Sequence, residues 1–279
     1  MQRLHLSQRL QLVAAHGFLL FYTLLAVFPV FIIIVNSFKG RRAIFANPYA
    51  LPTSETWDLV GYQTLFKNGN YPGYFLNSII VVGAALILIL FLGSMAAFAF
   101  SEYKFPGNTL LSLYASLGIM IPIRLGTVSL LRLVVDLNLI NTLLALILVY
   151  TAQGLPLAIF ILTSFMQQVP KDLKDAGRVD GASEYRIFWL ILPLVRPALG
   201  TVAVFTMIPV WNDLWFPLIL APAEAVKTLT LGSQSFLGQF LMDWNAILAA
   251  LALSIIPILI LYIIFARQLV RGITSGAVK

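Results

Sequence analysis

The sequence contains no cysteine and few charged residues. Among its 279 residues, Asp, Glu, Lys and Arg together account for only 10%, whereas 60% are hydrophobic. The absence of cysteine excludes disulfide bonds, thiolate metal sites and a cysteine nucleophile. Soluble domains average about 25% charged residues, so this chain has too little charge to keep its whole surface in water. We therefore expect an all-α integral membrane protein.

Several motifs of enzyme chemistry are also missing. The sequence has no Gly-x-x-x-x-Gly-Lys-Ser/Thr phosphate loop, no His-Glu-x-x-His zinc helix and no Gly-x-Ser-x-Gly elbow. Without the phosphate loop the chain cannot itself bind and hydrolyse ATP in that way. The net charge of +7 is distributed over the ends of apolar runs, which disfavours a nucleic-acid surface because such a surface needs clustered basic residues. We expect no catalytic residues, no metal and no cofactor in this chain.

Six apolar runs are each close to the roughly 20 residues that a helix needs to cross the hydrocarbon core of a membrane. They cover residues 16–36, 75–100, 109–131, 143–165, 199–220 and 246–265. Pro122 and Arg124 interrupt the third run, so we expect its span to end near Pro122 and a short amphipathic helix to follow along the outer surface. The chain as a whole, 1–279, is predicted to be a single transmembrane domain with six helices and a core at about 75–265.

The distribution of basic residues favours cytoplasmic termini. With six spans both termini lie on the same side, and eleven basic residues then fall on the cytoplasmic side and seven outside, together the eighteen of the chain. An excess of Lys and Arg marks the cytoplasmic side. The cluster Lys39, Arg41 and Arg42 after the first span argues for the opposite orientation.

The most distinctive segment is polar and covers residues 170–197, between the fourth and fifth runs. Pro170 suits a helix start, and Gly181 suits a left-handed helix end. Ser183 can cap a second helix, which runs into Pro193. The first of these helices has an apolar stripe at three-residue spacing, formed by Leu173, Ala176 and Val179.

This segment resembles the EAA loop of ABC-importer permeases, whose consensus is Glu-Ala-Ala, two free positions, Asp-Gly-Ala and, further on, Leu-Pro. The positions that the resemblance assigns to coupling with an ATPase are Asp175, Ala176, Gly177, Asp180, Gly181, Ala182, Leu192 and Pro193. Asp175 replaces the Glu of the family, and Gly177 replaces its second Ala at a cost of about 1 kcal/mol in helix stability. The alternative is an ordinary cytoplasmic helical hairpin with a chance Asp-Gly turn.

Two further segments resemble the carbohydrate class of these permeases. Residues 211–217 resemble its Trp-Asn motif, and residues 271–279 resemble the tail of the maltose and oligosaccharide class, which reaches into the ATPase interface. The tail positions are Ser275, Gly276, Val278 and Lys279. The chain therefore resembles the six-span permease subunit of a type I ABC sugar importer.

The resemblance implies several partners and a location. These are a second permease subunit in a heterodimer, two cytoplasmic ATPase subunits that bind the ATP, and an extracytoplasmic sugar-binding protein. The location is the lipid bilayer of a bacterial or archaeal plasma membrane, with both termini in the cytoplasm. Nucleic acid is not among the expected partners.

Polar and aromatic residues in the spans are candidates for the translocation path. They are Trp211, Asn212, Asp213, Trp215 and Asn77. Asn212 and Asp213 are expected inside an apolar helix, where a carboxylate costs about 3 kcal/mol on insertion scales. The alternatives are a hydrogen bond between helices for Asn212 and Asp213, interfacial anchoring for the tryptophans, and a helix start for Asn77.

The second outer loop, residues 221–245, is assigned by resemblance to contact with the binding protein. Its candidate residues are Gly232, Phe236, Gly238, Phe240 and Trp244. The alternative is a loop that packs on the helix bundle.

Three other functions remain open at the level of sequence. The same architecture could import another solute, such as a polyamine or a glycerophosphodiester. A stand-alone secondary transporter or channel would usually show inverted repeats, which the sequence lacks. An intramembrane enzyme would need a catalytic pair, and Asp213 has no visible mate in the sequence.

Overall fold

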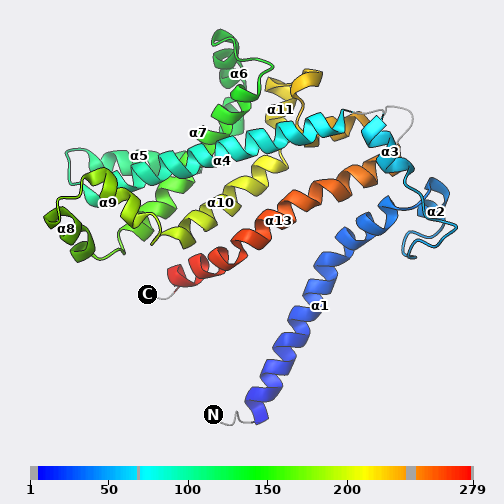
Figure 1. Ribbon diagram of the computed structural model, residues 1–279, viewed down its shortest axis with the longest axis horizontal. Coiled ribbons are helices and arrows are strands. Elements are labelled where there is room, and N and C mark those ends of the chain that lie inside the picture. Colours follow the sequence, from blue (N-terminus) through cyan, green and yellow to red (C-terminus); the bar gives the residue numbers. More distant parts are fainter. Residues whose placement is uncertain (1–5, 68–69, 237–242, 278–279) are drawn as a thin grey trace. The chain divides into compact units, whose positions relative to one another are not determined.

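The computed structural model describes residues 6–67, 70–236 and 243–277 (Figure 1). Within these ranges the regular elements are helices, and β-structure is limited to one isolated bridge between Lys39 and Trp57. This confirms the predicted all-α class.

Among the residues that the structure describes, four helices are long and apolar enough to cross a membrane. They are α1 (Leu6–Ser37), α4 (Tyr71–Glu102), α7 (Leu143–Met166) and α13 (Trp244–Ala277). Two bent helix pairs, 108–136 with a bend of 85° and 184–211 with a bend of 74°, bring the candidate spans among the described residues to as many as six. The six predicted runs fit this upper number.

Contacts divide the chain into two compact units. The first consists of residues 1–70 and 233–256, and the second of residues 71–232 and 257–279. The first unit contains α1, α2 (Arg41–Ala46), α3 (Val60–Lys67), η3 (Gln234–Phe236) and the beginning of α13.

Lys39 is a buried connector of the first unit. Its Nζ donates to Asn36 Oδ1 and to the carbonyl of Asn47, each at 3.1 Å, and its own carbonyl accepts from Asn245 Nδ2 at 2.7 Å. Burial lowers the pKa of this lysine. Lys39 therefore ties the segment after α1 to the start of α13.

The second unit is built around the packing of α4 along α7. A Cβ added to Gly93 would lie only 2.8 Å from the Cβ of Ala158, so the absence of a side chain there lets the two helices approach, as small residues do in membrane interfaces. Helix α5 (Asn108–Met120) and helix α10 (Arg196–Trp211) also pack on α7.

The third and fifth predicted runs are both broken. In the third, α5 is followed by η1 (Ile123–Gly126) and α6 (Thr127–Asp136), which confirms the break predicted at Pro122. The fifth was expected to be continuous, which is wrong: α10 ends at Trp211, and a separate helix, α11 (Trp215–Leu220), follows. Between them, the carboxylate of Asp213 binds distant side chains and the first amides of α11, as described below.

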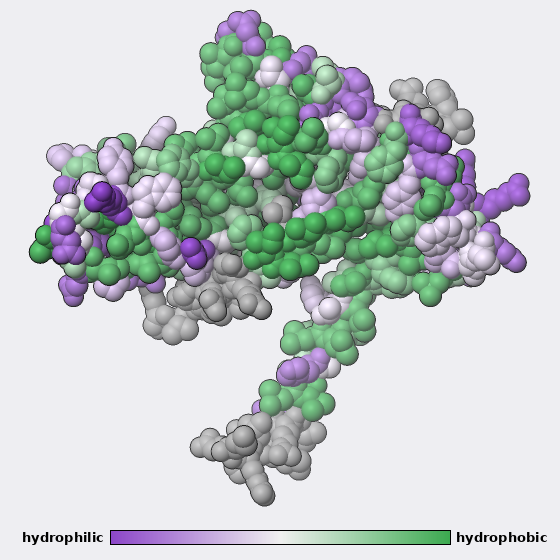
Figure 2. Space-filling model, in the orientation of Figure 1, coloured by the Kyte–Doolittle hydropathy of each residue, from purple (hydrophilic) through white to green (hydrophobic). Residues whose placement is uncertain are grey.

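Short helices connect the longer ones. Helices α8 (Lys171–Val179) and α9 (Glu184–Ile191) lie together near the end of α4, and η2 (Glu224–Val226) and α12 (Leu229–Ser233) follow α11 (Figure 1). Figure 2 shows a largely hydrophobic surface along the visible face of the long helices, with hydrophilic residues gathered around α8 and α9. This is the surface expected of helices that face lipid.

Candidate functional site

Helix α8 and the turn that follows it have the local structure predicted from the sequence. The helix follows Pro170, and Gly181 ends it with a left-handed φ of +78°. The amide of Ala182 closes the turn on the carbonyl of Gly177 at 2.9 Å. Ser183 caps α9, because its Oγ accepts from the amide of Arg186 at 3.4 Å. One glycine thus joins the two helices at this turn.

One face of α8 is apolar and open. Val179 is 88% exposed and Leu173 41%, and Ala176 between them is also exposed. Apolar residues exposed on a polar helix usually mark a contact surface. Among the predicted coupling residues, Asp175, Asp180 and Gly181 are exposed beside this stripe.

The remaining coupling residues lie on both sides of the turn. Gly177 and Ala182 are half-buried where α8 meets α9, and Leu192 and Pro193 lie at the end of α9. The structure therefore brings the residues from 175 to 182 together and places Leu192 and Pro193 one helix away.

The opposite face of α8 is held by an ion-pair network that the sequence did not reveal. Glu102, the last residue of α4, receives Lys174 Nζ at 2.6 Å and Arg178 Nη2 at 2.7 Å. Arg178 also pairs through Nε with Glu184 at 3.0 Å and through Nη1 with Asp175 at 2.8 Å. The sequence signal was the four-residue spacing of Lys174 and Arg178, which places both on one helix face.

The same network shifts the ionisation of its outer members. The hydrogen bonds to Glu184 and then to Glu102 raise the pKa of Arg178. Tyr103 donates to Glu184 Oε2 at 2.7 Å; burial first, and then this carboxylate, raise the pKa of Tyr103 to about 12. Both groups keep their protons at physiological pH.

Asp213 is the centre of a second polar cluster, at the break between α10 and α11. Its carboxylate accepts from Arg124 Nη2 at 3.0 Å, Tyr150 Oη at 2.9 Å and the amides of Phe216 at 3.1 Å and Trp215 at 3.3 Å. Asp213 is 8% exposed. Arg124 is thus the charged partner of Asp213. The carboxylate lies at the start of α11, where it joins three segments, instead of lying inside a continuous helix.

The other translocation-path candidates are dispersed. Trp211 is buried with its ring edge-to-face against Phe75, whereas Asn212 is exposed and bonds back to the carbonyl of Ile208 at 2.9 Å. Trp215 is exposed and donates from Nε1 to Thr127 Oγ1 at 3.1 Å. The structure does not bring these residues together on one surface.

Asn77 holds the segment that contains η2. Its Nδ2 donates to the carbonyls of Ala225 and Lys227, each at 3.0 Å, and the neighbouring Ser78 Oγ accepts from the amide of Leu229 at 2.8 Å. Because α4 already begins at Tyr71, the prediction that Asn77 starts the helix is wrong.

The residues assigned to the binding-protein loop are partly packed. Gly232 is buried, and a Cβ at this position would collide with the ring of Tyr74. Trp244 meets Phe45 edge-to-face with ring centroids 5.9 Å apart, and Phe236 is half-buried. Gly238 and Phe240 lie outside the described residues. These contacts favour the packed-loop interpretation at Gly232 and Trp244.

The tail candidates fall at the end of the described chain. Ser275 and Gly276 lie within α13, and Val278 and Lys279 lie outside the described residues.

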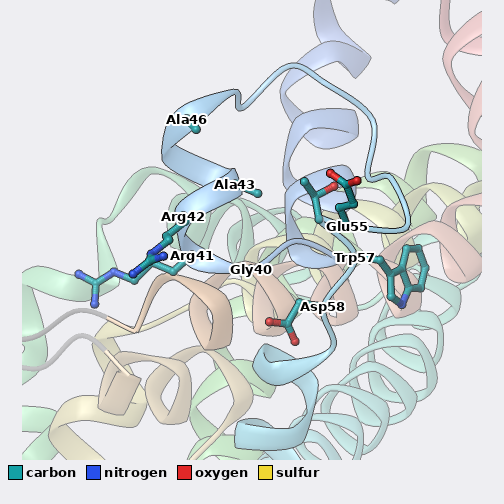
Figure 3. Close-up of a pocket in the computed structure, with 9 residues that line it drawn as sticks. Gly40, Arg41, Arg42, Ala43, Ala46, Glu55, Trp57 and Asp58 are labelled. Carbon is teal, nitrogen blue, oxygen red and sulfur yellow. The ribbon is translucent and has the colours of Figure 1, made fainter.

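The segment after α1 forms a shallow hollow of about 540 Å³ in the first unit (Figure 3). Arg41 and Arg42 extend side by side from the start of α2, while Glu55, Trp57 and Asp58 lie on the returning segment. In the part of the chain that the structure describes, no three His, Asp or Glu side chains are grouped to ligate a metal.

Comparison with known proteins identifies the family. The family described as "Binding-protein-dependent transport system inner membrane component" matches residues 89–275, which include α8, its turn and the Asp213 cluster. The chain belongs to this family. It is therefore a membrane-embedded permease of an ABC transporter.

Individual relatives match over nearly the whole chain. A diacetylchitobiose uptake system permease protein from Streptomyces coelicolor is 31% identical over 95% of this chain and 88% of its own length. A putative ABC transporter permease protein from a Caldicellulosiruptor species is 38% identical over 94% of this chain and 95% of its own length.

A solved structure has the same fold. It is a bacterial ABC transporter involved in the import of the acidic polysaccharide alginate, and one of its chains matches with a TM-score of 0.81 at 18% identity, covering 96% of this chain and 99% of that chain. The type I importer permease fold predicted from the sequence is thereby confirmed.

Proposed function

We propose that this permease forms one half of the translocation path of an ATP-driven sugar importer and takes its motion from a separate ATPase through α8. The observation that carries the proposal is the open apolar stripe of Leu173, Ala176 and Val179, on a short helix that Gly181 ends with a left-handed backbone. A chain without a phosphate loop needs an external motor, and this stripe is the surface on which such a motor can dock.

The complete importer contains three further kinds of subunit. They are a second permease paired with this one as a heterodimer, two ATPase subunits on the cytoplasmic side, and an extracytoplasmic binding protein that delivers the solute. ATP is bound by the ATPase subunits, and this chain holds no cofactor of its own. In this arrangement α8 and both termini are cytoplasmic, and the chain crosses the membrane six times.

The proposed cargo class is sugar. Support comes from relatives named for diacetylchitobiose uptake and for alginate import and from the Trp-Asn segment at residues 211–217. ATP-driven closure of the motor moves α8, and the helices switch between inward-facing and outward-facing states because the motor contacts α8 differently in each.

Replacing Val179 by Asp tests the docking surface. Val179 is 88% exposed, so the change does not disturb the fold, but a carboxylate in an apolar contact costs about 2–4 kcal/mol. We expect the Val179→Asp variant to insert normally and to lose the ATPase when the complex is purified in mild detergent.

Val60→Asp is the matched control, because Val60 at the start of α3 is also exposed, at 40%, and lies outside the candidate spans. It should retain the ATPase. Uptake by the wild-type complex is then measured with sugars, polyamines and glycerophosphodiesters. ATPase retention in Val179→Asp would contradict docking on α8, and uptake of a non-sugar alone would contradict the cargo class.

A further inference from the structure

A buried ion pair holds α8 on the face opposite its apolar stripe. The side chain of Lys174 is 4% exposed and that of Glu102 is 10% exposed, with Nζ and Oε2 2.6 Å apart. Removing one partner from a buried ion pair leaves an uncompensated charge and is strongly unfavourable. The pair therefore fixes where α8 sits against the end of α4.

Glu102 uses both carboxylate oxygens on the same helix. Oε2 receives Lys174, and Oε1 receives Arg178 Nη2 at 2.7 Å. Because the two cations are four residues apart, they lie one above the other on α8. A carboxylate bound at two points in this way restrains the rotation of α8 as well as its position.

The backbone connection from α8 to α9 is more flexible than the ion pairs to Glu102. It passes through Gly181, whose φ of +78° is held by short turn hydrogen bonds, and a Cβ there would meet nothing within 4 Å. Glycine adopts this conformation without strain and has the widest backbone freedom. Motion of α8 is therefore poorly transmitted through the turn unless a second connection braces it.

Arg178 supplies part of this second connection, because it binds both Glu184 and the carboxylate of Glu102. Its Nε binds Glu184 at the start of α9, while Nη2 binds Glu102. Helix α4, which carries Glu102, packs along α7 and contacts α10. A displacement of α8 thus reaches the packed core of the unit through Glu102.

We propose that Glu102 is the positioning residue that transmits movement of the coupling helix α8 to α4, through its simultaneous ion pairs with Lys174 and Arg178. This inference rests on the proposed function, since it assigns the path by which the docked motor drives the membrane helices. The faces of α8 are then divided between an apolar stripe that receives the motor and a charged face that passes the motion to α4.

The test uses the natural lack of cysteine in this chain. Val179→Cys carries a nitroxide label, and its mobility is measured by electron paramagnetic resonance in lipid nanodiscs, with and without Glu102→Gln. In parallel, unlabelled complexes with their partner subunits are assayed for basal ATPase activity and for ATP-driven uptake. The control is Glu55→Gln, which removes an exposed carboxylate from the first unit.

We expect Glu102→Gln to increase the mobility of the label. It should also lower ATP-driven uptake about tenfold, a change within the usual range of coupling between two sites. Basal ATPase activity should stay within about twofold of the wild-type value. Glu102→Asp keeps the charge and should recover part of both signals. Glu55→Gln should change neither. Thermal melting of each variant verifies that the chain remains folded.

The outcomes separate the two proposals. Unchanged label mobility in Glu102→Gln would overturn the anchoring role, and increased mobility with normal uptake would overturn the transmission role. If the wild-type complex shows no ATP-driven uptake at all, the importer assignment fails and transmission fails with it, whereas the label still shows whether Glu102 holds α8.

Discussion

At the scale of single residues, Asp213 shows how a membrane-embedded carboxylate can be stabilised entirely by the protein. Arg124 offers a full positive charge, Tyr150 a hydroxyl, and the first amides of α11 two more donors. A carboxylate with this many donors is well compensated, and the buried Tyr150 hydroxyl would be left unpaired without it. This favours a structural role for Asp213 over direct contact with the transported solute.

Replacing Asp213 by Ala should therefore lower stability before it lowers transport. We expect the free energy of unfolding to fall by about 1–3 kcal/mol, because the buried Tyr150 hydroxyl and the first amides of α11 lose their acceptor. The measurement is thermal denaturation of the purified chain followed by size-exclusion chromatography. Asp136→Ala, which removes an exposed carboxylate at the end of α6, is the control and should melt like the wild type. A stable Asp213→Ala variant with abolished uptake would instead place Asp213 in the translocation path.

At the scale of helices, Gly181 and Gly177 stand four residues apart and have different requirements. Gly181 has a left-handed backbone, whereas Gly177 has helical neighbours and a Cβ there would make an ordinary contact of 3.6 Å with Ile187 Cγ1. A β-branched residue at φ of +78° carries strain of about 1–3 kcal/mol. The turn can release this strain by reorienting α8 against α9.

We expect Gly181→Val to reach the membrane in normal amounts and to lose most ATP-driven uptake. Gly177→Ala should keep uptake and stabilise α8 by up to about 1 kcal/mol, because alanine is the better helix former. Both variants are assayed for membrane content by immunoblot and for uptake in vesicles. Normal uptake by Gly181→Val would show that the angle between α8 and α9 does not matter for coupling.

The starts, ends and breaks of the helices show which elements could be predicted from the sequence. The start of α8, its glycine end and the Ser183 cap all depend on residues next to one another, and all three were predicted correctly. One part of the break between α10 and α11 is local, since Asp213 accepts from the amides of Trp215 and Phe216. The other part could not be predicted from the sequence, because Arg124 and Tyr150 lie 89 and 63 residues from Asp213. Glu102 was missed for the same reason, since its two partners lie 72 and 76 residues further along the chain.

At the scale of the whole molecule, the orientation in the membrane decides whether a cytoplasmic motor can reach α8. Two exposed arginines, Arg41 and Arg42, follow α1 on the side that we assign to the exterior, against the usual bias. Lys39 belongs to the same cluster, but its buried bonds to Asn36 and Asn47 give it a structural reason to be there. The polar loop with α8 must face the cytoplasm for a motor to reach it.

Two single-cysteine variants decide the orientation, because the natural chain offers no competing thiol. Glu55→Cys places a thiol in the segment after α1, and Asp172→Cys places one on α8; both native carboxylates are exposed. In right-side-out vesicles, a membrane-impermeant maleimide should label Glu55→Cys at once and Asp172→Cys only after permeabilisation. The reverse pattern would put α8 outside the cell, where no ATP-driven motor could dock, and the importer assignment would have to be abandoned together with the orientation.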